Sequence, residues 1–126
     1  MRHICPEHSR TQVDKAGKTL VAGGSEAETD AALAVLNNWR AAHERPLSLL
    51  HAVLTEKLRE IDASTIVAHR LKRLPSILNK LRPPSKMRLS RMQDIGGLRV
   101  VVPEIAQVHA VAAAFCSDPV FLGRLE

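Results

Sequence analysis

Basic side chains and one carboxylate gather in a single stretch of this sequence, and together they could bind phosphate. Eight Lys and Arg residues and no Asp or Glu lie between Ala63 and Gln93, while the rest of the chain holds ten basic and thirteen acidic residues. The net charge of +5 therefore comes wholly from this basic segment. A one-sided block of this kind usually meets phosphate, and Asp94, which follows it, is a residue type that holds magnesium.

Phosphoryl and pyrophosphoryl transfer need little covalent help from a protein. They need cations that neutralise phosphate charge and a carboxylate that holds a metal ion. Asp94 is the only carboxylate candidate here, and an isolated Asp in so positive a field should stay ionised. The cation candidates are Lys72, Arg73, Lys80, Arg82, Lys86, Arg88 and Arg91.

Each of these residues also has a purely structural interpretation. A run of Lys and Arg is usually a solvated surface, and Asp beside Gly commonly caps a turn. Ser76 follows Pro75 and could cap a helix, while Arg99 at a strand start could pair with a neighbour. The joint spacing of two motifs favours the nucleotide interpretation over these.

The two motifs are R-x-K-x-x-x-S-I-x-x-K, from Arg70 to Lys80, and D-I-G-G-L-R, from Asp94 to Arg99. In this order they resemble the first half of a RelA/SpoT-type alarmone synthetase domain. The upstream stretches SRTQVDKAGKTL and VLNNWRAAHERPL resemble the N-terminal helices of a small, stand-alone subgroup of that family. The resemblance implies magnesium-dependent transfer of pyrophosphate from ATP to the 3′-hydroxyl of GDP or GTP, which makes (p)ppGpp.

The resemblance also implies roles for single residues. Arg70 and Arg99 would sandwich the adenine ring of ATP, which suits a planar guanidinium. Asp94 would be the catalytic residue that coordinates Mg²⁺. The residues near the triphosphate would be Lys72, Ser76 and Lys80, and a loop that closes over the phosphates would carry Arg88 and Arg91.

The chain departs from the family pattern in its second half. The family has a Tyr that stacks on the guanine of the acceptor and a second catalytic Glu, but this sequence has no Tyr and no Glu between Glu104 and Glu126. We therefore expect a truncated, ATP-binding portion of the domain with little or no synthetase activity. Residues 1–10 are expected to be a disordered lead, and residues 11–126 this portion of the domain.

Three other functions stay open. A toxin of the same family would pyrophosphorylate the 3′ end of tRNA, which the basic segment would suit. A non-enzymatic module would bind the phosphate backbone of RNA or DNA without magnesium. An interaction module would complete its open sheet with a second copy of the chain or with a complementing chain.

The expected fold class is α+β, with N-terminal helices packed on the start of a mixed sheet, as in a nucleotidyltransferase-like synthetase. In the helix from Ser25 to about Ala42, Arg40 shares an apolar stripe with Leu36 and Trp39. The expected order begins with a helix over Gln12–Leu20, a helix from Ser25 with a Ser25–Glu28 capping box, a loop over His43–Pro46 and a helix over Leu47–Ile61. A strand over Thr65–Lys72 and a helix over Pro75–Arg82 follow. The last elements are a positive-φ turn at Gly96–Gly97, a strand over Leu98–Val102 buried on both faces, and a helix from Pro103 to an end at Asp118–Pro119.

Nothing in the sequence predicts a membrane location. No apolar run is long enough to cross a bilayer, and the first residues lack the apolar core of a signal peptide. Cys5 and Cys116, far apart in the sequence, are expected to be free thiols in a reducing compartment. We therefore expect a cytoplasmic protein.

Overall fold

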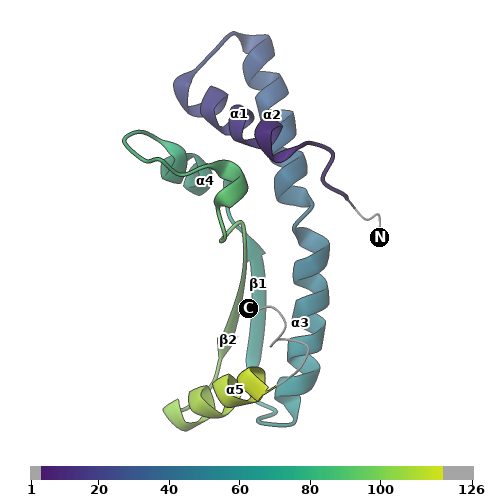
Figure 1. The fold of residues 1–126 in the computed structure, drawn as a ribbon. Helices are drawn as coiled ribbons and strands as arrows, with labels where there is room; N and C mark the ends of the chain where they lie inside the picture. The colour runs from purple at the N-terminus through teal and green to yellow at the C-terminus, as the bar shows by residue number, and fades with distance from the viewer. Residues whose placement is uncertain (1–3, 118–126) are drawn as a thin grey trace. The chain divides into compact units, whose positions relative to one another are not determined.

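The computed structural model describes residues 4–117 and has an α+β fold (Figure 1). Its elements are α1 (Arg10–Ala22), α2 (Glu26–Ala41), α3 (Glu44–Arg59), β1 (Ile66–Leu71), α4 (Leu74–Leu81), the 3₁₀ turn η1 (Leu89–Arg91), β2 (Gly96–Val101) and α5 (Ile105–Ser117). The sheet predicted as mixed is, in these residues, a two-stranded antiparallel pair of β1 and β2. None of the helices within residues 4–117 has the length and apolar character that crossing a bilayer requires.

The chain divides into two compact units. The first holds Met1–Ser48 and His69–Gly97, and the second holds Leu49–Ala68 and Leu98–Glu126. Both strands and α3 begin in one unit and end in the other. All residues of the basic segment from His69 onward, and Asp94 itself, belong to the first unit.

The first unit is built on a pair of helices, α1 and α2, which lie side by side (Figure 1). α1 also packs against α4 and η1, and a Cβ at Gly17 would lie 3.2 Å from both Leu81 and Leu89. The absent side chain at Gly17 therefore lets these elements approach closely. The buried core of this unit consists of Val13, Leu36, Ile77, Leu81, Leu89, Met92 and Ile95.

The helix caps differ from the prediction. The full reciprocal capping box is at Ser9 and Gln12, where each side chain accepts a hydrogen bond from the other residue's backbone N–H. This cap explains why α1 begins two residues before the predicted start at Gln12. At Ser25 the hydroxyl accepts from the Glu28 N–H but donates to the Glu28 carboxylate, so only half of the predicted box forms.

The predicted loop over His43–Pro46 is wrong, because α3 already begins at Glu44. Pro46 lies in the first turn of that helix. Backbone N–H groups in a first turn have no partner within the helix, so the missing N–H of proline costs nothing there. Only Ala42 and His43 separate α2 from α3.

The predicted turn at Gly96–Gly97 is also wrong. Both glycines lie in β2, and among residues 4–117 only Gly23 has a positive φ. Gly96 is required for space, because a Cβ there would lie 2.6 Å from Cδ1 of the buried Leu47. The strand therefore starts two residues earlier than Leu98, at the point where it passes Leu47.

The second unit exposes much of its apolar surface. Burial along β2 alternates between partly buried and exposed residues, with Arg99 and Val101 exposed, so the prediction of a strand buried on both faces is wrong. A two-stranded sheet has too few neighbours to cover both faces. α5 carries no charged residue, yet Ile105 is 75% exposed. The end predicted at Asp118–Pro119 lies outside the described residues.

The lead segment is held in place where the structure describes it. The side-chain amide of Asn38 on α2 accepts a hydrogen bond from the Glu7 N–H at 2.9 Å and donates one to the Cys5 carbonyl at 3.2 Å. Residues 5–7 have no regular secondary structure. Their backbone is nevertheless attached to α2.

Candidate phosphate-binding site

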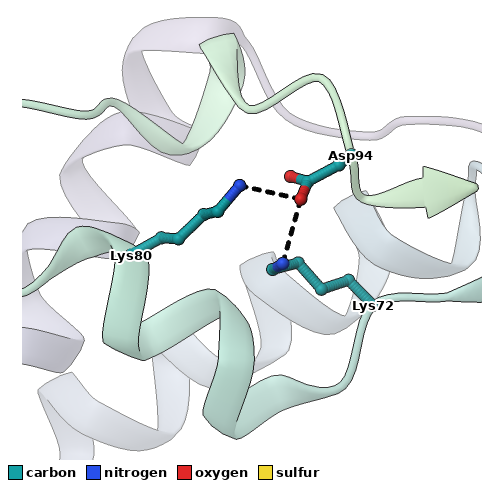
Figure 2. Close-up of polar contacts among 3 residues, drawn as sticks. All are labelled: Lys72, Lys80 and Asp94. Carbon is teal, nitrogen blue, oxygen red and sulfur yellow. Dashed lines mark hydrogen bonds and ion pairs between the residues drawn. The ribbon is translucent and has the colours of Figure 1, made fainter.

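Two lysines from different elements share one carboxylate oxygen (Figure 2). The Nζ atoms of Lys72 and Lys80 donate to Oδ2 of Asp94 at 3.0 Å and 2.8 Å. These bonds, first that of Lys80 and then that of Lys72, lower the pKa of Asp94 to about 2. Asp94 is therefore fully ionised at neutral pH, and the three side chains carry a net charge of +1.

Each member of this Lys72–Asp94–Lys80 cluster comes from the end of a short element. Lys72 directly follows β1, Lys80 lies in the last turn of α4, and Asp94 precedes β2 by two residues. The Lys72 N–H donates to the Ile95 carbonyl at 2.6 Å, which joins the start of one strand to the end of the other. The strand pair therefore brings Lys72 to Asp94.

A side chain of α2 holds the backbone carbonyl of Lys72. Nε of Arg40 donates to the Lys72 carbonyl at 2.8 Å in a partly buried position. The backbone of Lys72 is thus held both at its N–H and at its carbonyl. Its side chain is only 18% exposed, compared with 47% for Lys80 and 48% for Asp94.

An open cleft of about 700 Å³ lies next to the cluster. Four cationic side chains and one carboxylate contribute to its lining, so an anion inside it would meet a strongly positive surface. Two polar residues, Ser85 and Gln93, and two methionines, Met87 and Met92, complete its wall. The lining residues are Lys80, Ser85, Lys86, Met87, Arg88, Arg91, Met92, Gln93 and Asp94.

The wall that carries Arg88 and Arg91 is anchored to α1. Oδ1 of Asp14 accepts a hydrogen bond from the Ser90 N–H at 2.8 Å, in the middle of η1. Leu89, on the same turn, is buried in the core of the first unit. The loop predicted to carry Arg88 and Arg91 therefore ends in a fixed turn.

The residues predicted for the site fall into two groups. Lys72, Lys80 and Asp94 contact one another, and Arg88 and Arg91 lie on the wall of the adjoining cleft. Ser76 and Arg70 are exposed on α4 and β1 and do not line the cleft. Arg99 is exposed on the part of β2 that belongs to the second unit, so the sandwich of adenine between Arg70 and Arg99 stays a prediction.

Sequence reasoning assigns no role to Asp14 and no role at the site to Arg40. Asp14 is 76 residues from Ser90, and no local pattern links them. Arg40 did carry a signal, because a guanidinium on an apolar helix stripe must find a partner when it is buried. That partner, the Lys72 carbonyl, is 32 residues away.

The carboxylate of Asp94 does not form a metal site by itself. Among residues 4–117 no three His, Cys, Asp or Glu side chains gather as metal ligands. Both lysines contact Oδ2 of Asp94, however, so Oδ1 carries neither of them. Magnesium is commonly held by one or two carboxylates together with substrate phosphates and water, and Asp94 fits that arrangement only when phosphate is present.

Comparison with known proteins adds no family to this geometry. No protein-family model matches the chain, and no curated protein matches it either.

Proposed function

We propose that the first unit binds the phosphates of ATP, with magnesium, in the cleft beside Asp94. The observation that carries this proposal is the convergence of Lys72 and Lys80 on Asp94 at the edge of a cleft with four cationic side chains. Polyphosphate binding requires several cations around a small volume and a carboxylate within reach of the metal. All of these groups lie in one unit.

Within this proposal the residues have distinct tasks. Lys80, Lys86, Arg88 and Arg91 neutralise and orient the phosphate oxygens, because their side chains line the cleft. Asp94 holds the magnesium ion, which when bound neutralises charge on the phosphates. Lys72 keeps the Asp94 carboxylate in place, since its own backbone is fixed at both ends.

The motifs from Arg70 to Lys80 and from Asp94 to Arg99 extend the proposal to a family. We propose a cytoplasmic relative of the RelA/SpoT-type alarmone synthetases, in the ATP-binding portion of their nucleotidyltransferase-like fold. Pyrophosphate transfer to GDP or GTP, or to the 3′ end of tRNA, also needs an acceptor site. The sequence contains no Tyr to stack on a guanine, so we expect little or no transfer by this chain.

Binding to a nucleic-acid backbone is the main alternative use of the basic segment. A backbone binder spreads its cations along an extended track and has no need of a metal-binding acid. Here four cations surround one cleft, and the acid lies among them. This arrangement favours a compact polyphosphate over an extended backbone.

Calorimetric titration with ATP tests the proposal. We expect binding in the presence of Mg²⁺, and a loss of the magnesium-dependent part in Asp94→Asn. Single-stranded RNA serves as the competing ligand. Tighter, magnesium-independent binding of RNA by both proteins, with no binding of ATP, would replace the nucleotide function with the nucleic-acid one.

Release of AMP from ATP with GDP or GTP at a rate typical of enzymes, about 1 per second or faster, would contradict the expected lack of transfer.

A further inference from the structure

The cluster of Lys72, Asp94 and Lys80 has two lysines where one would balance the charge. Both contact the same oxygen, at distances of 3.0 Å and 2.8 Å. The two lysines are placed differently. Lys72 has a fixed backbone and a side chain that is largely buried, whereas Lys80 is half exposed and lines the cleft.

Without phosphate, the net positive charge of this site would repel a magnesium ion. The cluster and the remaining cations of the cleft, Lys86, Arg88 and Arg91, carry five positive charges, and Asp94 carries the only negative one. A polyphosphate reverses this balance. It also offers Lys80 new oxygens in the same cleft, which an exposed lysine with rotatable bonds can reach without moving α4.

We propose that the Lys80 ammonium, held on the Asp94 carboxylate, keeps a metal ion from binding to that carboxylate until a polyphosphate enters the cleft. On phosphate binding, the Lys80 ammonium exchanges the Asp94 carboxylate for a phosphate oxygen, and the carboxylate then accepts Mg²⁺. Lys72 remains on Asp94 throughout and holds it in place. The inference rests on the proposed function and adds an order to it, in which phosphate binds before or together with the metal.

The test uses the full chain, Mn²⁺ as a spectroscopic substitute for Mg²⁺, and inorganic tripolyphosphate. Paramagnetic resonance counts free Mn²⁺, and calorimetry measures tripolyphosphate binding without metal. Wild-type protein is expected to bind tripolyphosphate in the absence of metal, and to bind Mn²⁺ much more weakly without tripolyphosphate than with it. The quantity compared is the Mn²⁺ bound by the mixture of protein and tripolyphosphate in excess of the Mn²⁺ bound by tripolyphosphate alone.

Lys80→Met is the decisive variant, because methionine has an unbranched side chain of similar length and carries no charge. We expect its affinity for Mn²⁺ without phosphate to rise about tenfold, and its affinity for tripolyphosphate to fall about tenfold, as loss of one charge-assisted contact predicts. Lys86→Met is the matched control. It removes an equal charge from the same cleft, but Lys86 has no contact with Asp94 among those described, so only its tripolyphosphate affinity should fall.

The Lys80→Met/Asp94→Asn double variant should lose the added Mn²⁺ binding, which places that binding at Asp94. Equal Mn²⁺ binding by wild type with and without tripolyphosphate would overturn the proposed order. A rise in Mn²⁺ affinity of the same size in Lys80→Met and Lys86→Met would reduce the effect of Lys80 to general charge and overturn the blocking role. Either result leaves the proposed function intact, whereas wild type that binds no tripolyphosphate removes both.

Discussion

Nε of Arg40 donates a hydrogen bond to the backbone carbonyl of Lys72 at 2.8 Å. The contact joins the last turn of α2 to the residue that follows β1. Because the Lys72 ammonium holds Asp94, a helix of the core thereby fixes the position of the candidate metal-binding carboxylate.

Replacement of Arg40 by Met should leave the Lys72 carbonyl without this partner. We expect a loss of about 1–3 kcal/mol in the free energy of unfolding, the usual cost of an unsatisfied, partly buried acceptor. Tripolyphosphate affinity should fall as well, because Lys72 and Asp94 lose their fixed geometry. Urea unfolding and calorimetry measure the two effects. Arg45→Met, an equal loss of charge at an exposed position of α3, should change both by much less.

Replacement by alanine should lower the stability of the protein at Gly96 but not at Gly97. A Cβ at Gly96 would lie 2.6 Å from Leu47 Cδ1, so Gly96→Ala should destabilise the protein by about 1–3 kcal/mol. A Cβ at Gly97 meets nothing within 4 Å, and its φ is not positive. Gly97→Ala should therefore be neutral or stabilise by up to about 1 kcal/mol, through the lower entropy of the unfolded chain. Similar urea midpoints for the two variants would contradict the close contact with Leu47.

The Lys72–Asp94–Lys80 cluster should make stability depend on acid pH. The pKa of Asp94 is lowered from its ordinary value of 3.8 to about 2, so the folded state favours the ionised carboxylate. The stabilisation is complete above the ordinary pKa and is lost as pH falls through about 2. It should amount to less than about 1 kcal/mol, since solvent screens half-exposed charges.

Wild type and Asp94→Asn provide the comparison for this pH effect. The difference between their unfolding free energies should be constant from pH 7 down to about pH 5 and should shrink by pH 3. Urea unfolding at these pH values measures it. A difference that does not change with pH would show that the lysines do not hold the carboxylate in solution.

Asp14 should act through its acceptor oxygen and not through its charge. Its Oδ1 accepts from the Ser90 N–H, and Asn at this position keeps an oxygen there. Asp14→Asn should therefore retain most of the stability, while Asp14→Ala should lose about 1–2 kcal/mol. Tripolyphosphate affinity should fall only in Asp14→Ala, as η1 with Arg91 loses its anchor. Equal loss in both variants would assign the effect to charge.

The local features of the fold were predictable from the residues around them. The helical pattern of Ser25–Ala42 and the acid after the basic segment are each visible within a short window; the first corresponds to α2, and the second is the carboxylate that Lys72 and Lys80 contact. The loop predicted over His43–Pro46 rests on Pro46, because proline disfavours helix in the residue before it. Its position in a first turn reverses that inference, and only the full helix boundary reveals it.

The tertiary contacts were not predictable in this way. The need for glycine at position 96 arises from Leu47, and the bond that anchors η1 comes from Asp14; neither partner is near in sequence. The exposure of β2 depends on how many neighbours a strand has, which a run of Leu and Val does not reveal. Residue types therefore indicate the residues of the candidate site more readily than the tertiary contacts that hold those residues in place.

The attachment of the lead segment to Asn38 offers a spectroscopic use. The Cys5 carbonyl is bonded to the Asn38 amide, while the Cys5 thiol is free and exposed. In a Cys116→Ser background, a thiol-reactive fluorophore at position 5 would therefore sit on a backbone whose rotation is restricted by α2. Its fluorescence anisotropy would report whether that attachment persists as denaturant is added. The phosphate cleft itself would carry no label.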